Sequence, residues 1–271
     1  MARKRKLAEV WHHRVSSSIS NWRNKIEKRY GLPTVNWPIF ENTLFFGLYH
    51  PLDYLRFLLC RGKRKVFWAG SDILALEKTT YWKRIIARIN AEHICENYVE
   101  QQKLREMGIK ARVQPICLST PYPELSYRWT EDAHVYLTMR KGSEDAYGRG
   151  IIVKIASKFP NITFHLYGCY CMVGKNKNII WHGIVSEEEF NKDIKNYHAC
   201  IRLNKHDGFG DALAKSCLMG QWPISAIAYP YTSHAPNLKT LIGALEDLKD
   251  KKTPNCEGRA YWLRELSKDL V

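Results

Sequence analysis

From about residue 43 onward, short apolar runs alternate with longer stretches in which apolar residues recur at helical spacing. This alternation is typical of parallel β-sheets with helices on both faces. In the first half of the chain it predicts helices near residues 51–60, 78–90 and 98–107. The strands that it predicts there are TLFFGLY, KVFWAG, HICEN and ARVQPI.

The segment STPYPELSYRWTED is rich in proline and polar residues and predicts a linker, after which the alternation restarts. Ser186 and Glu189 have the spacing of a capping box at the start of a helix over 187–197. The other helices predicted here end near Lys158 or cover 210–219 and 257–271. The predicted strands are HVYLTM, ITFHLYG, NIIWHG, ACIRLN and PISAIA.

We therefore expect an α/β protein with two Rossmann-like domains that face a cleft. The first domain would span residues 1–126 and carry a basic N-terminal helix. The second would span residues 127–271, and its terminal helix would pack back toward the first.

Lysine and arginine outnumber aspartate and glutamate by 42 to 27, which gives a formal net charge of +15. Such an excess favours polyanions, anionic lipid surfaces or phosphorylated small molecules as partners, but a basic protein surface without a specific partner would look the same. The sequence has no apolar secretory leader and no run of about 18 apolar residues, so we expect a cytoplasmic protein without a transmembrane segment. Its eight cysteines are scattered through apolar runs, as expected of buried free thiols, and Cys169 and Cys171 lack the spacing of a zinc site.

The N-terminal thirty residues hold nine basic and two acidic side chains, together with Trp11, Ile19, Trp22 and Ile26. One interpretation is that this segment docks peripherally on anionic lipid. The other is that it forms a helix packed on its own domain.

The stretch KHDGFGDALAKSCLMGQ lies between a predicted strand and a predicted helix. Gly208 and Gly210 would let a ligand approach the backbone, where the first amides of the helix favour a phosphate or a sugar hydroxyl. Two glycines at such a corner can also serve only to make the bend.

The surrounding run YHACIRLNKHDGFGDALAKSCLMGQWPISA resembles the nucleotide-sugar domain of retaining GT-B glycosyltransferases, the family of glycosyl transferases group 1. Upstream, VYLTMRKG, KIASKFPNITFHLYG and WHGIVSEEEFNKDIKNYHA match the same family in the same order. The similarity covers residues 134–228, and it implies a second domain that binds the donor and a first domain on the acceptor side.

The resemblance implies that Arg140 and Arg149 neutralise the donor diphosphate, a task to which guanidinium groups are suited. Lys205 would add to this positive field, and Ile184 and Val185 would line the base. Gly208, Phe209 and Gly210 would present backbone amides to the sugar or phosphate. Asp207 stands where the family's glutamate approaches the transferred sugar.

Lys215 departs from the family pattern, because it stands where an acidic residue usually holds the ribose. A lysine has hydrogen-bond donors only and cannot accept from ribose hydroxyls. Three explanations stay open: the ribose is held by other groups, the donor is a different one, or the protein has lost activity.

In the first half, the acceptor side, VFWAGSDIL resembles a strand-to-loop segment of the family that faces the cleft. Ser71 and Asp72 would lie at the end of a strand, and Asp72 would act as a base or orient a hydroxyl, unless it only caps a turn. Gly47 and His50, in the loop GLYHP, are further candidates on this side.

Together these features predict a glycosyltransferase that moves a sugar from a nucleotide-sugar donor to an acceptor of unknown class: glycan, lipid-linked, protein or nucleic acid. The resemblance implies that the transfer proceeds with retention. We expect no cofactor and no metal, because Arg140, Arg149, Lys205 and a helix N-terminus can stabilise the leaving diphosphate. The alternatives are a nucleic-acid-binding or DNA-modifying protein on the same scaffold, or an inactive descendant.

Overall fold

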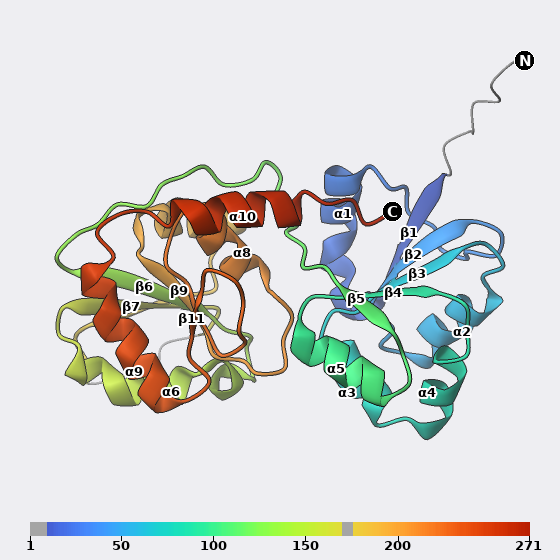
Figure 1. The fold of residues 1–271 in the computed structure, drawn as a ribbon, viewed down its shortest axis with the longest axis horizontal. Helices are drawn as coiled ribbons and strands as arrows, with labels where there is room; N and C mark the ends of the chain where they lie inside the picture. The colour runs from blue at the N-terminus through green and yellow to red at the C-terminus, as the bar shows by residue number, and fades with distance from the viewer. Residues whose placement is uncertain (1–9, 170–175) are drawn as a thin grey trace, which may run out of the picture. The chain divides into compact units, whose positions relative to one another are not determined.

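The structure is a computed structural model, and it describes residues 10–169 and 176–271. The chain divides into two compact units, each built on one parallel sheet with helices around it (Figure 1). The first unit runs to Thr120 and also includes His206–Gly208 and Lys268–Val271. The second contains Pro121–Lys205 and Phe209–Ser267. The predicted α/β class is confirmed.

The first unit has a five-stranded sheet in the order β1-β2-β3-β4-β5, in which every neighbouring pair is parallel. Both faces are covered, because Phe45 belongs to one apolar cluster while its neighbours Leu44 and Phe46 belong to another. The strands are β1 (Trp11–Val15), β2 (Asn42–Phe46), β3 (Arg64–Phe67), β4 (Glu92–Cys95) and β5 (Ala111–Val113). The α-helices are α1 (Arg23–Tyr30), α2 (Pro51–Leu59), α3 (Ser71–Glu77), α4 (Thr80–Ile86) and α5 (Tyr98–Glu106).

The N-terminal segment contains β1, a strand that the sequence pattern does not predict, in front of the short basic helix α1. Because WHHRV contains three polar residues, it does not have the apolar pattern of a buried strand. In the structure His13 is nevertheless fully buried, and its ring nitrogen Nδ1 lies 2.8 Å from the Leu32 carbonyl oxygen. Ile26 is also fully buried, and Trp11, Ile19 and Trp22 pack on the cluster around Leu44 and Phe46. The apolar side chains that were candidates for lipid docking are therefore part of the core of this unit.

The second unit has a six-stranded sheet in the order β11-β10-β9-β6-β7-β8, and its paired strands are parallel. The chain moves outward from β6 to β8 and then crosses to β9 on the other side of β6, so the carboxyl ends of β6 and β9 lie where the strand order reverses. The strands are β6 (Ala133–Thr138), β7 (Ile162–Tyr167), β8 (Ile179–Gly183), β9 (Ala199–Arg202), β10 (Ile224–Ser225) and β11 (Ser233–His234). The α-helices are α6 (Arg149–Ile155), α7 (Glu187–Asp193), α8 (Asp211–Leu218), α9 (Leu238–Glu246) and α10 (Cys256–Leu266).

Helix α7 begins as its sequence predicts, because the Ser186 side chain accepts a hydrogen bond from the Glu189 backbone amide. Helices α6 and α9 share one apolar cluster with alternate residues of β6 and β7, such as Val135 and Phe164. Helix α8 lies on the opposite face, where the Tyr136 hydroxyl donates to the Ala212 carbonyl oxygen. Helix α9 and strand β11 are absent from the sequence-based expectation.

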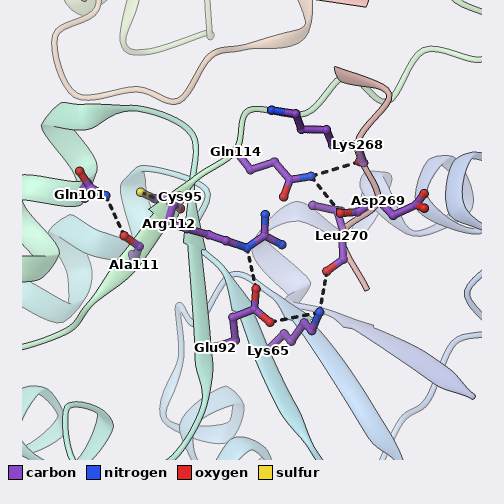
Figure 2. Close-up of polar contacts among 10 residues, drawn as sticks. All are labelled: Lys65, Glu92, Cys95, Gln101, Ala111, Arg112, Gln114, Lys268, Asp269 and Leu270. Carbon is purple, nitrogen blue, oxygen red and sulfur yellow. Dashed lines mark hydrogen bonds and ion pairs between the residues drawn. The ribbon is translucent and has the colours of Figure 1, made fainter. Parts of the chain in front are cut away.

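The predicted terminal helix over 257–271 is too long, since α10 ends at Leu266 and the last four residues belong to the first unit. Leu270 is buried in the cluster that contains Ile26, so its apolar side chain serves the first sheet and not the last helix. The backbone of this segment is held by Lys65, whose Nζ donates to the Leu270 carbonyl oxygen at 3.1 Å (Figure 2). Gln114 Nε2 donates to the carbonyl oxygens of Lys268 and Asp269.

In the described part of the chain, no helix is long and apolar enough to cross a membrane. The cysteines placed there are free; six are buried and Cys256 is exposed. Cys171 lies outside the described residues. Among the described residues, Trp68 and Trp262 are the largest fully buried side chains, as expected for packing residues and not for a base-stacking surface.

Four histidines form a polar array across the second sheet, in which His165 and His198 are buried and His134 and His182 are half-buried. His134 Nδ1 and His165 Nε2 are 2.9 Å apart, and His165 Nδ1 lies 2.9 Å from His182 Nε2 and 3.0 Å from the Tyr197 hydroxyl. His198 Nδ1 accepts from the His134 backbone amide at 3.0 Å. Burial, and next the nearby rings of His134 and His182, lower the pKa of His165 to about 3.

This array should make the fold less stable in mild acid. Below about pH 6.5 the unfolded state protonates His165 while the folded state keeps it neutral, so each further pH unit should remove up to about 1.4 kcal/mol of stability. Urea unfolding of the wild type and of His165→Gln between pH 7.5 and 5 measures this contribution. The His165→Gln variant should lose less stability on acidification than the wild type. The control His234→Gln, at an exposed histidine, should lose as much as the wild type. Equal losses in the wild type and in His165→Gln would contradict the assignment.

Candidate functional site

A pocket of about 360 Å³ lies in the second unit, at the carboxyl ends of its central strands. Open parallel sheets bind ligands at this edge, because loops and helix N-termini converge there. The residues around the pocket come from the ends of β6, β7 and β9, from the loop after β8 and from α7 and α8. They are Thr138, Met139, Tyr167, Gly168, Ile184, Val185, Ser186, Glu187, Phe190, Arg202, Asp211, Ala212 and Lys215.

One side of the pocket is apolar. Ile184 is 60% exposed, and Val185 follows it in the loop between β8 and α7. The ring of Phe190 meets the ring of Tyr167 edge to face at 5.0 Å. Aliphatic and aromatic side chains arranged in this way can contact the face of a planar ligand such as a nucleobase.

The pocket also carries a charged triad made of Glu187, Asp211 and Lys215. Lys215 Nζ lies 2.8 Å from Asp211 Oδ2 and 3.1 Å from Glu187 Oε1, and it also lies over the Phe190 ring. The Lys215 side chain is 3% exposed, whereas those of Asp211 and Glu187 are 38% and 47% exposed. Burial alone would lower the pKa of Lys215, but the two carboxylates outweigh it and raise this pKa, so the ammonium is charged at neutral pH.

Arg202, at the end of β9, is a pocket residue that the sequence reasoning misses. Its guanidinium lies over the Tyr147 ring at 5.5 Å and packs against Gly210, where a Cβ would come within 2.7 Å of Arg202 Cζ. In the sequence, the only indication of its role is that Arg202 is the single charged residue of the predicted strand ACIRLN, two residues before the strand's end.

Gly168 follows β7 and is a second residue that the sequence-based list lacks. Its φ is +86°, in the left-handed region that favours glycine, and a Cβ there would lie 2.1 Å from the Met139 carbonyl oxygen. Its amide donates to the Gly183 carbonyl oxygen at 2.7 Å. Gly168 therefore lets the ends of β6, β7 and β8 approach one another at the pocket.

Of the donor-side residues expected from the sequence, Ile184, Val185 and Lys215 line this pocket. Arg149 makes two hydrogen bonds to the Asp145 carboxylate through Nε and Nη2, and Arg140 is exposed; neither lines the pocket.

The turn formed by Gly208, Phe209 and Gly210, called the glycine corner here, is held largely by packing. The side chain of Phe209 is fully buried and stacks on Trp262 at 4.3 Å, so only its backbone could meet a ligand. Gly210 has a φ of +73° and precedes the first residue of α8. Lys205 is exposed and does not line the pocket.

Asp207 and Gly208 belong to the first unit. The Asp207 carbonyl oxygen accepts from Asn97 Nδ2 at 3.1 Å, and its Oδ1 accepts from the Gly208 amide. A Cβ at Gly208 would overlap the Glu96 carboxylate, at 1.6 Å from Oε2, so close packing favours glycine here. Both interpretations of this corner, the ligand-binding one and the structural one, are compatible with these contacts.

The acceptor-side candidates lie around the carboxyl end of β3 and the loop after β2. Asp72 is fully buried and accepts from the backbone amides of Ala69 (3.0 Å), Ile73 (2.9 Å) and Leu48 (3.3 Å), as expected of a turn aspartate. Burial raises the pKa of Asp72 to about 7, although these amides act in the opposite direction. The carboxylate would have to become accessible before it could act as a base.

Of the other three acceptor-side candidates, Ser71 and His50 are exposed and Gly47 is buried. Ser71 Oγ lies 3.1 Å from the Tyr49 hydroxyl, and His50 Nε2 lies 2.8 Å from Ser18 Oγ. Gly47 has a φ of +71°, and a Cβ there would meet the Tyr49 ring at 2.5 Å. No three histidine, cysteine, aspartate or glutamate side chains are placed as metal ligands within residues 10–169 and 176–271.

The sequence matches no protein-family profile and no curated protein. Solved structures with low sequence identity do match the fold. TarM superposes with a TM-score of 0.54 at 12% identity, over 83% of this chain and 52% of its own, so this chain spans about half the length of TarM. The outer core galactosyltransferase WaaB gives a TM-score of 0.56 at 13% identity, over 91% of this chain and 74% of its own.

HepE from Anabaena, solved in complex with UDP-glucose, gives a TM-score of 0.60 at 11% identity, over 91% of this chain and 85% of its own. At such identities the similarity establishes the fold. It agrees with the two parallel sheets and with the resemblance that the sequence shows around its glycine corner. The chain has the GT-B fold of glycosyltransferases.

Proposed function

We propose that this protein is a glycosyltransferase that moves a sugar from a nucleotide-sugar donor to an acceptor, and that the pocket of the second unit holds the nucleotide. The observation that carries the proposal is the chemistry of that pocket. An apolar wall around Ile184, the carboxylates of the triad and the guanidinium of Arg202 surround one space at the carboxyl edge of the sheet. HepE, which shares the fold, is solved with UDP-glucose.

Each part of a nucleotide has a matching group in this pocket. The base would lie against Ile184, Val185 and Phe190, since apolar and aromatic side chains favour planar rings. The diphosphate would lie toward Arg202, because guanidinium groups bind phosphate oxygens through paired hydrogen bonds. The first-turn amides of α8, which follow Gly210, would add positive potential for the same anion.

The reaction breaks the bond between the sugar and the diphosphate, so negative charge develops on the leaving diphosphate. Arg202 would stabilise that charge electrostatically, and Arg140 in the loop after β6 and Arg149 at the start of α6 would add positive potential from outside the pocket lining. We include retention of configuration and independence from metal in the proposal, on the strength of the family resemblance and of these arginines. Asp207 is the proposed contact to the transferred sugar.

Arg202→Ala should weaken binding of the donor by about 10- to 100-fold, because a charge-assisted contact to phosphate contributes about 1.5–3 kcal/mol. Titration calorimetry with UDP-, GDP- and ADP-sugars, with and without EDTA, measures this effect. Arg264→Ala, at a side chain that is 68% exposed, is the matched control and should bind like the wild type. Unchanged affinity in Arg202→Ala, or failure of the wild type to bind any of these donors, would contradict the proposal.

A further inference from the structure

The triad of Glu187, Asp211 and Lys215 combines one buried cation with two carboxylates that reach the pocket. Both carboxylates contact the same Lys215 nitrogen. The three groups together carry a formal charge of −1, from one ammonium and two carboxylates. The part of the triad that a ligand can reach is therefore a pair of hydrogen-bond acceptors, although its central residue has donors only.

The chain places this triad between the two other chemistries of the pocket. Glu187 stands two residues after Val185, at the end of the apolar wall. Asp211 directly follows Gly210, the residue against which the Arg202 guanidinium packs. A nucleoside diphosphate has the same order of parts: a planar base, a sugar with vicinal hydroxyls, and a diphosphate.

We propose that the carboxylates of Asp211 and Glu187 accept hydrogen bonds from the vicinal hydroxyls of the ribose, and that Lys215 is a positioning residue that holds both carboxylates in place. This inference rests on the proposed function and adds specificity for ribonucleotides over 2′-deoxyribonucleotides. Lys215 then marks a rearranged ribose site, in which the acceptors lie one helical turn earlier on α8 and on the neighbouring α7.

The physical basis is the cost of an unsatisfied carboxylate. When a ribonucleotide binds, the carboxylate loses water and gains a hydroxyl donor in its place. A 2′-deoxyribonucleotide displaces the same water and offers no donor, so the carboxylate is left without that bond. Without the ammonium of Lys215, the two carboxylates would repel each other and move apart.

The test compares ribo- and deoxyribonucleoside diphosphates by calorimetry on the full chain. The probes are UDP and dUDP, GDP and dGDP, and ADP and dADP. For each pair that binds, the wild type should prefer the ribonucleotide by at least about 10-fold. Asp211→Asn should weaken the ribonucleotide by about 10-fold or more and leave the deoxyribonucleotide within about twofold, because only the ribonucleotide uses the carboxylate.

Variants at Lys215 separate positioning from folding. Lys215→Arg keeps the cation and should keep the preference for ribose, whereas Lys215→Met should lose it even where the far-ultraviolet spectrum is unchanged. If Lys215→Met does not fold, Asp211→Asn and Lys215→Arg decide the matter by themselves.

The outcomes distinguish this inference from the function on which it rests. Equal affinity of the wild type for both members of every pair overturns the inference and leaves nucleotide binding intact. A ribose preference that survives Asp211→Asn and Glu187→Gln also overturns it, since other groups would then recognise the hydroxyls. Failure of the wild type to bind any of the six nucleotides overturns the proposed function and the inference with it.

Discussion

Replacing Lys215 by glutamate, the residue type that the family pattern would favour, should destabilise the second unit by about 3–5 kcal/mol near pH 8. The Lys215 side chain is 3% exposed and its ammonium lies between the carboxylates of Asp211 and Glu187. A glutamate there would bring a third carboxylate into the same buried space. Urea unfolding, followed by circular dichroism and by tryptophan fluorescence, measures the loss.

The matched control is the double variant Lys215→Glu with Asp211→Lys, which reverses the i,i+4 pair on α8 and restores one opposite charge. It should recover a measurable part of the lost stability, and the difference between the variants gives the coupling energy of the pair. If Lys215→Glu is as stable as the wild type at pH 8, the ammonium is not the group that holds the two carboxylates together.

Gly168→Ala should destabilise the second unit by about 3 kcal/mol or more and weaken nucleotide binding. The added Cβ would lie 2.1 Å from the Met139 carbonyl oxygen, which belongs to the backbone and cannot move aside as the end of a flexible side chain could. A positive φ adds about 1 kcal/mol for a residue with a side chain, and overpacking adds about 1–3 kcal/mol. Thermal and urea unfolding measure the stability, and calorimetry measures the binding.

Two other glycines separate these effects. Gly142 also has a positive φ of +81° but no atom within 4 Å of a Cβ, so Gly142→Ala should show the backbone cost alone. Gly243 lies within α9 with open space around it, so Gly243→Ala should stabilise the protein by about 0.5–1 kcal/mol. A loss in Gly168→Ala no larger than that in Gly142→Ala would refute the close approach of β6 and β7 at the pocket.

The alternation of strands and helices could be predicted because buried parallel strands are continuous apolar runs and their helices have apolar faces. KVFWAG and ITFHLYG are examples, and both contain the strands that the structure shows. Strand β1 could not be predicted in this way, because its buried residue His13 is held by a contact to Leu32 that lies nineteen positions away. The end of the last helix escaped prediction for a similar reason, since the cavity that Leu270 fills is built by residues of the first sheet.

Parts of the candidate site could be predicted from the sequence, but not the contacts that depend on residues far away along the chain. The family resemblance implied that Ile184 and Val185 line the base, and both residues lie at the pocket. The environment of Lys215 could not be inferred, because it depends on Glu187, which reaches it from another helix. Arg202 was missed because a single charge at the end of a strand gives no indication of the side from which a ligand approaches.

Hydrogen exchange of backbone amides, measured with and without the nucleotide sugar that binds, tests the central claim most directly. We predict that the donor slows exchange at the carboxyl ends of β6 and β7, in the loop after β8 and in the first turns of α7 and α8, the segments that line the pocket. Protection confined to other segments, or no protection by any UDP-, GDP- or ADP-sugar at millimolar concentration, would contradict the assignment of this pocket to a nucleotide-sugar donor.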